Sequence, residues 1–161
     1  KPAFLADGTV TAGTASPLTD GASATLICTE EYADKHGLPK LARIKAIATT
    51  GLEPEIMGMG PVEATRKAMD RAGIAIGDVD VMELNEAFAS QALACIHELG
   101  IDPAKVNLDG GAIAIGHPLG ASGARIMATL IAAMEKRDAK TGVASLCIGG
   151  GEATAVCLKR V

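Results

Sequence analysis

The sequence predicts an α/β protein with a mostly parallel, mixed five-stranded sheet that is covered by helices and has an antiparallel strand at its edge. Segments with the apolar pattern of strands alternate with segments of helical periodicity, which favours parallel strands joined by helical crossovers. Aromatic residues make up only 2% of the chain and 19 residues are Gly, a composition that suits closely packed layers. Three consecutive Gly separate the last two expected strands, and this connection is too short for a crossover.

The expected strands and helices follow from local patterns. The nearly continuous apolar segment 24–29 predicts a strand buried on both faces. Thr29 is a typical N-cap residue and precedes two Glu, so a helix is expected to begin there and to end near Gly37. Pro61 is typical of the first turn of a helix, and Gly73 of the position just after one. The remaining expected elements are strands at 42–50, 80–84, 143–148 and 153–158, and helices at 61–72, 86–99 and 121–137.

Length, charge and cysteine usage limit the function classes. The 161 residues fit one domain with a sizeable core. The net charge is −4 and no basic block is present, so no nucleic-acid partner is expected. No apolar run reaches the length of a membrane span and no signal peptide is visible, so no membrane association is expected. The chain opens at Lys1 and is expected to be part of a longer protein. The four Cys form no Cys-x-x-Cys pair and are interpreted as reduced thiols of a cytoplasmic protein, with no metal site: Cys28, Cys95, Cys147 and Cys157.

A Gly-rich stretch at 110–125 contains a single His and is the first candidate for chemistry. Its five Gly allow close approach of backbone and ligand, and Pro118 restricts the backbone of His117. We expect a rigid turn that points one imidazole in a defined direction. The alternative is a tight connection between two elements in which the His has no special role.

Two further residues stand where strands are expected to end. Asn85 follows the expected strand 80–84, and ligands bind at such ends in open α/β sheets. The alternative for Asn85 is a plain helix N-cap. Cys147 enters the triple-Gly turn, whose backbone N–H groups are suited to an oxyanion, and a Cys can act as nucleophile or proton carrier there. The alternative for Cys147 is a small buried hydrophobe, the interpretation kept for the other three Cys.

Taken together, these stretches resemble the thiolase family, and the resemblance extends over essentially the whole chain. Five blocks in family order are more specific than any one of them. They point to the C-terminal catalytic domain, over residues 1–161, and to the acetyl-CoA acetyltransferase branch. The matching blocks are Gly8–Gly13, Asn85–Ala89, Gly110–Pro118, Gly120–Arg125 and Cys147–Gly151.

The resemblance implies an acyltransferase that catalyses Claisen condensation of acyl-CoA or thiolytic cleavage of 3-ketoacyl-CoA. By position, it implies that Cys147 is the general acid/base. It implies that His117, with a water held by Asn85, forms an oxyanion hole for the enolate, and that the Gly149 N–H contributes to a second one. A coenzyme A thioester is implied as substrate and no cofactor is expected. The residues at positions that contact pantetheine or the acyl end in the family are Ser16, Met57, Ala87 and Phe88.

The resemblance also implies parts that this chain lacks. Family members carry a nucleophilic Cys in an N-terminal domain, within a Cys-x-Ser-Gly type motif, and none of the four Cys has that context. The loop domain that binds the nucleotide end of CoA is also expected to be missing. The chain alone is therefore expected to be inactive, to expose an apolar face where the N-terminal domain packs, and to belong to a homo-oligomer in the full enzyme. The alternative hypothesis is a non-catalytic acyl-CoA-binding or assembly module with the same fold.

Overall fold

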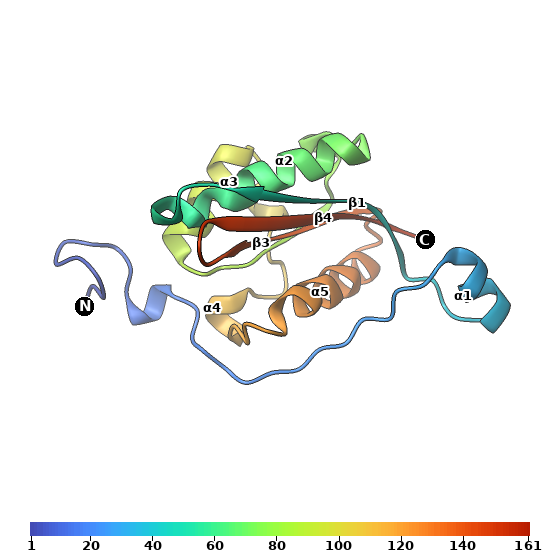
Figure 1. Ribbon diagram of the computed structural model, residues 1–161, viewed down its shortest axis with the longest axis horizontal. Helices are drawn as coiled ribbons and strands as arrows, with labels where there is room; N and C mark the ends of the chain where they lie inside the picture. The colour runs from blue at the N-terminus through green and yellow to red at the C-terminus, as the bar shows by residue number, and fades with distance from the viewer.

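The computed structural model describes residues 1–161 and contains one four-stranded sheet, in the order β1-β4-β3-β2 (Figure 1). Strand β4 pairs antiparallel with both β1 and β3, whereas β2 and β3 are parallel. The hairpin that joins β3 to β4 turns through the three consecutive Gly. The strands are β1 (Ala42–Gly51), β2 (Val81–Leu84), β3 (Thr141–Ile148) and β4 (Glu152–Arg160).

The α/β fold class is confirmed, but the sheet differs from the expected one. Segment 24–29 is not a strand: it runs extended along the helix at 122–136, on the side away from the sheet (Figure 1), with Leu26 77% and Ile27 66% exposed. An apolar run of this length does not distinguish a buried strand from a segment that lines a groove. Antiparallel pairs predominate, and the last two strands do pair antiparallel, but β4 lies inside the sheet because β1 covers its other side.

Helices cover both faces of the sheet (Figure 1). Helices α2 (Gly60–Ala72) and α3 (Ala89–Leu99) lie on one face, and α5 (Ser122–Lys136) lies on the other. Alternate residues of β2 point to the two sides, so Met82 joins the core under α2 and α3 while Val81 joins the core under α5. Two cores of aliphatic side chains therefore hold the sheet between its helices.

The remaining elements are short. Helix α1 (Glu30–His36) is capped by Thr29, whose Oγ1 accepts a hydrogen bond from the Tyr32 N–H, and it ends at Gly37 as expected. Helix α4 (Ala112–Ile115) precedes the His-containing turn. No helix of the structure has the length and apolar character needed to cross a bilayer. The 3-10 helices are Ala12–Thr14, Pro54–Met59, Ile76–Asp78 and Pro103–Lys105.

An apolar groove of about 710 Å³ lies between the segment 24–44 and helix α5. Fifteen of its 22 lining residues are hydrophobic. Its rim exposes large apolar side chains, among them Leu26, Ile27 and Leu41. This groove follows the side of α5 that faces away from the sheet core, and whether it is the face expected to contact the N-terminal domain stays a prediction.

Helix α2 approaches β4 so closely that only Gly is accommodated at position 60. A Cβ atom there would lie 2.6 Å from the Ala153 Cβ. We expect Gly60→Ala to lower the free energy of unfolding by about 1–3 kcal/mol through overpacking. Gly123→Ala is the control, since its Cβ would meet nothing within 4 Å and Ala favours the helix by roughly 0.5–1 kcal/mol. Urea denaturation of both variants measures the difference, and equal stabilities would contradict the close approach.

Candidate functional site

The parallel pair of strands brings two candidate residues to one edge of the sheet. Leu84 pairs with Ser145, and the Asn85 N–H donates to the Ser145 carbonyl oxygen at 3.0 Å. Cys147 lies two residues beyond Ser145 on β3. Because parallel strands share the direction of their carboxyl ends, Asn85 and Cys147 stand at the edge where ligands bind in open α/β sheets.

Asn85 carries a buried amide without a protein partner. The residue is 1% exposed, and neither its Oδ1 nor its Nδ2 has a hydrogen-bond partner. The N-cap interpretation is wrong, since helix α3 begins only at Ala89 and its N-cap is Phe88 in an extended conformation. A buried amide left unpaired costs about 1–3 kcal/mol, so a group retained in this state is suited to hold a ligand or a water.

Cys147 is a buried thiol next to an open turn. It is 8% exposed, and burial raises the pKa of its thiol, so the protonated form predominates at neutral pH. In the turn that follows, Gly150 and Gly151 have φ of +98° and +93°, a region that favours Gly. Gly149 lies exposed at the start of this turn, and a Cβ added there would meet no atom within 4 Å. The arrangement combines a proton carrier with an accessible backbone turn.

His117 is held by backbone and side-chain contacts on both sides. Its N–H donates to the Pro17 carbonyl oxygen at 3.1 Å, and its Nδ1 lies 2.6 Å from the Ser122 Oγ. Burial, and secondly the positive charge of Arg125, hold the pKa of His117 below its ordinary value of 6.5. Gly116 precedes it with φ of +97°, where a Cβ would also collide with Thr19. The imidazole is therefore neutral at neutral pH and fixed in orientation.

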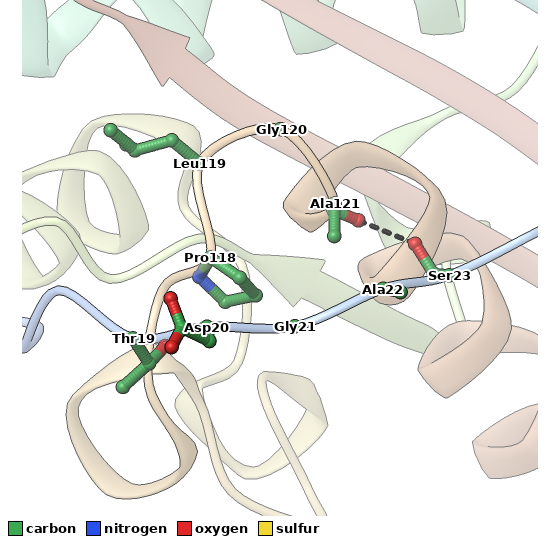
Figure 2. A pocket seen from close by; sticks show the side chains of 9 residues that line it. All are labelled: Thr19, Asp20, Gly21, Ala22, Ser23, Pro118, Leu119, Gly120 and Ala121. Carbon is green, nitrogen blue, oxygen red and sulfur yellow. Dashed lines mark hydrogen bonds between the residues drawn. The ribbon is translucent and has the colours of Figure 1, made fainter.

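An N-terminal segment, residues 15–18, connects the loop after β2 with the His117 turn. The Ser16 N–H donates to the Ala87 carbonyl oxygen at 3.1 Å, and isolated bridges join Ala15 to Phe88 and Leu18 to His117. The chain continues along Pro118–Ala121, where the Ser23 hydroxyl donates to the Ala121 carbonyl oxygen at 2.8 Å (Figure 2). Predicted site residues from three distant parts of the sequence are thereby tied together.

Met57 belongs to a segment that is held by hydrogen bonds at both ends. It belongs to the 3-10 helix Pro54–Met59, and the following Gly58 carbonyl oxygen accepts a hydrogen bond from the Cys95 thiol at 3.2 Å. At the other end of this helix, the Leu52 N–H donates to the Gly151 carbonyl oxygen at 2.8 Å. The first bond fastens the Met57 segment to helix α3, and the second fastens the residues before it to the turn that follows Cys147. Convergence of the Cys147, His117 and Asn85 side chains on one small cavity stays a prediction.

Glu86 is an organising residue to which sequence reasoning assigned no role. Its carboxylate accepts hydrogen bonds from the Asn107 Nδ2 and the Ile113 N–H, both at 3.1 Å. Asn107 also bonds the backbone of Leu84 through both ends of its amide, each at 2.8 Å. Gly111 passes so close that a Cβ there would collide with the Glu86 carboxyl group. In the sequence, only the paired Gly at 110–111 indicated a close approach at this point. The pair does not show that Glu86 is the residue approached.

Arg125 acts electrostatically on both His117 and the buried Glu83. All three guanidinium nitrogens of Arg125 are buried without a hydrogen-bond partner. Glu83 is 1% exposed, and burial raises the pKa of its carboxyl to about 7, against the opposing effect of Arg125. Nowhere in the structure do three His, Cys, Asp or Glu side chains group closely enough to hold a metal ion.

The Glu86 carboxylate should control the order of the 107–115 loop. In Glu86→Ala the Ile113 N–H loses its only acceptor, so its hydrogen exchange should accelerate roughly tenfold to hundredfold, as expected for a lost bond of about 1.5–3 kcal/mol to a charged group. Ala114, whose N–H donates to the Gly111 carbonyl oxygen, should change less and is the internal control. Glu86→Gln retains an acceptor for the Ile113 N–H. Unchanged hydrogen exchange of Ile113 in Glu86→Ala would contradict the role of Glu86 in ordering this loop.

The positive charge of Arg125 should account for part of the lowering of the His117 pKa. In Arg125→Gln the pKa of His117 should rise toward 6.5 without reaching it, because burial is the larger cause and remains. Arg125→Lys keeps the charge and should keep the lowered pKa. Since the folded pKa lies below the unfolded one, the stability contributed by neutral His117 is present above about pH 6.5 and is lost as pH falls through the folded pKa. NMR titration measures both variants, and an identical pKa in Arg125→Gln would disprove the coupling.

Comparison with known proteins gives a consistent result. Residues 38–160 match the family model for the thiolase C-terminal domain, and residues 1–31 match that for the thiolase N-terminal domain. The chain is 58% identical over 160 residues to an acetyl-CoA acetyltransferase of Paracoccus denitrificans, covering 99% of this chain and 41% of that protein. It is 60% identical over 164 residues to a 3-ketoacyl-CoA thiolase of Vibrio parahaemolyticus, covering 99% and 42%.

The fold of the chain is also similar to that of a solved structure. Human mitochondrial 3-ketoacyl-CoA thiolase in complex with CoA superposes with a TM-score of 0.92 at 46% identity, covering 99% of this chain and 41% of that one. The chain thus spans about two fifths of the length of the relatives it matches. Sequence, fold and the placement of the matching blocks agree, and the chain belongs to the thiolase family.

Proposed function

We propose that this chain is the C-terminal catalytic half of an acyltransferase that acts on coenzyme A thioesters. The reaction is Claisen condensation of two acyl-CoA molecules, or the reverse, thiolytic cleavage of a 3-ketoacyl-CoA. The observation that carries the proposal is the placement of Asn85 and Cys147 at one sheet edge, with His117 tied to that edge through segment 15–18. Relatives named acetyl-CoA acetyltransferase and 3-ketoacyl-CoA thiolase support it.

In this proposal His117 and Asn85 stabilise the enolate. Removing a proton from the carbon next to a thioester carbonyl places negative charge on the carbonyl oxygen. A neutral imidazole donates a hydrogen bond to that oxygen, and the lowered pKa of His117 supports the neutral form. The unpaired Asn85 amide holds a water as the second donor. Fixed donors at this point lower the barrier because they need no reorganisation as the charge develops.

Cys147 moves the proton. In thiolysis its S–H protonates the carbanion carbon of the departing acyl-CoA, and in condensation its thiolate takes the proton from the same carbon. Burial that raises the pKa of Cys147 keeps the proton available for the first direction and makes the thiolate a stronger base in the second. The Gly149 N–H then belongs to a second oxyanion hole, for the tetrahedral adduct on the acylated nucleophile.

The substrate lies along segments on either side of this edge. We assign contacts with the pantetheine arm or the acyl end to Ser16, Met57, Ala87 and Phe88. The backbone bond between Ser16 and Ala87 supports this assignment, since it joins two of these segments. The CoA in the human mitochondrial relative supports a CoA thioester as the substrate class.

The nucleophilic Cys comes from another part of the protein in this proposal. Burial raises the pKa of Cys95 and of Cys157 to about 11, so neither thiol is suited to attack at neutral pH. The apolar groove along α5 is the surface on which the other half packs, and the complete protein is a homo-oligomer. A non-catalytic acyl-CoA-binding module is less favoured, because relatives at 58% and 60% identity carry the names of enzymes.

The role of Cys147 can be tested with a matched pair of cysteine variants. In the natural protein that contains this chain, Cys147→Ala should lower kcat for thiolysis of a 3-ketoacyl-CoA by about 10²–10⁴-fold, the usual contribution of a general acid or base. Cys157→Ala, which removes a buried thiol from β4, should leave kcat nearly unchanged. Intact mass after incubation with acetyl-CoA should show that Cys147→Ala still acquires an acetyl group.

Peptide mapping of that adduct separates the possible assignments. An adduct outside residues 1–161 supports a nucleophile elsewhere in the protein. In the unsubstituted protein, an adduct on Cys147 would make this residue the nucleophile and would overturn its acid/base role. Full activity of Cys147→Ala would overturn the proposed function itself.

A further inference from the structure

Ser122 stands between the His117 ring and the start of helix α5. It is the first residue of the helix and is fully buried. Its Oγ lies 2.6 Å from the His117 Nδ1 and 3.0 Å from the Pro118 carbonyl oxygen. The single hydroxyl proton therefore has two acceptors within reach, the His117 Nδ1 and the Pro118 carbonyl oxygen. Which of the two it bonds determines which ring nitrogen of His117 carries a proton.

The Pro118 carbonyl oxygen is already occupied. It accepts the Ala121 N–H at 2.8 Å and the Ser122 N–H at 2.9 Å, which uses both of its lone pairs. The contact with the imidazole is also the shorter of the two that the hydroxyl can make. A hydroxyl rotates to suit its partners, so the proton is best placed between Oγ and Nδ1.

We propose that Ser122 is a positioning residue that donates its hydroxyl proton to the His117 Nδ1 and thereby fixes the neutral tautomer with the remaining proton on Nε2. The Nε2–H is then the group available to an anionic oxygen. This rests on the proposed function, in which His117 stabilises the enolate, but the tautomer is a property of the protein that can be measured without substrate. An imidazole with its proton on Nδ1 would present a lone pair to the enolate oxygen and repel it.

The surroundings of the ring favour this state. A neutral imidazole holds one proton, so an acceptor role for Nδ1 commits that proton to Nε2. Arg125, three residues after Ser122 on α5, carries a buried positive charge that disfavours the imidazolium form. The backbone bond from His117 to Pro17 fixes the main chain of the turn, and the short contact between Nδ1 and the Ser122 Oγ orients the ring. Helix α5 thus supplies both the positive charge that disfavours the imidazolium form and the hydroxyl group that determines the tautomer of His117.

The tautomer is read by NMR of the natural protein that contains this chain, labelled with 15N only in histidine side chains. The His117 signals are assigned by their loss in His117→Asn. At neutral pH we expect a protonated-type Nε2 and an unprotonated, hydrogen-bonded Nδ1. A proton on Nδ1 would overturn the proposal, whatever the variants do.

Variants separate positioning from a merely structural role. In Ser122→Ala the Nε2–H state should lose its preference and the two tautomers should mix. The same variant should lower kcat by about tenfold to hundredfold, less than the roughly 10²–10³-fold expected for complete loss of an oxyanion donor, with KM little changed. Ser122→Thr retains the hydroxyl and should restore the Nε2–H signal. Thr129→Ala removes another hydroxyl of α5, one that bonds the Arg125 carbonyl oxygen, and should change neither the tautomer nor kcat.

The outcomes distinguish the two proposals. An unchanged His117 tautomer in a folded Ser122→Ala overturns the positioning role and leaves the proposed reaction in place. A changed tautomer with undiminished kcat means that His117 does not stabilise the enolate, which overturns the proposed function while the hydrogen bond stands. Loss of both the Nε2–H preference and kcat supports the two together.

Discussion

The candidate site depends on the parallel pairing of β2 with β3. This register is the only one in the sheet that gives two neighbouring strands a common carboxyl edge, since every other pair is antiparallel. The bond from the Asn85 N–H to the Ser145 carbonyl oxygen continues the pairing one residue past β2. A slip by one residue would turn the β2 side chains to the opposite face. The two apolar cores on either side of the sheet prevent such a slip, so packing far from the edge fixes the positions of Asn85 and Cys147.

Burial then sets the protonation state of each group near this edge. The same loss of hydration that keeps the Cys147 thiol protonated keeps the His117 imidazole neutral, because in both cases the charged form is the one that is penalised. For Glu83 burial outweighs the attraction of Arg125 and also favours the neutral acid. One physical cause thus prepares both a proton donor and a neutral hydrogen-bond donor.

Local signals in the sequence predicted the elements that are defined locally. The Thr29 cap, the Gly37 and Gly73 ends and the helices at 61–72 and 121–137 depend on contacts within a few residues, and the structure has them. Strand pairing is a long-range property, so the apolar segment 24–29 was wrongly assigned to the sheet and β4 to its edge. The helix expected from residue 86 begins at Ala89, because residues 85–88 are drawn into an extended loop by the partners they meet there.

The same limit applies to the candidate site. Single residues such as Asn85 and His117 were recognisable from Gly, Pro and strand-end context, and the family resemblance supplied their expected roles. The Glu86 bonds to Asn107 and Ile113 were not recognisable, since no spacing in a sequence links residues 21 and 27 positions apart. Nor did any sequence signal link the Ser122 hydroxyl to the His117 imidazole, because their contact depends on how the turn between them folds.

The N-terminal segment has a consequence for biosynthesis. Residues 15–23 emerge from the ribosome before their partners, which follow 71 positions later at Ala87 and 98 positions later at Ala121. Until Ala87 and Ala121 have been made, this stretch lacks these two partners. Contacts of such long sequence separation form slowly, because the chain loses the entropy of closing a long loop before the contacts contribute any stabilising free energy. The rim of the candidate site is therefore completed only after the chain up to the start of helix α5 has been made.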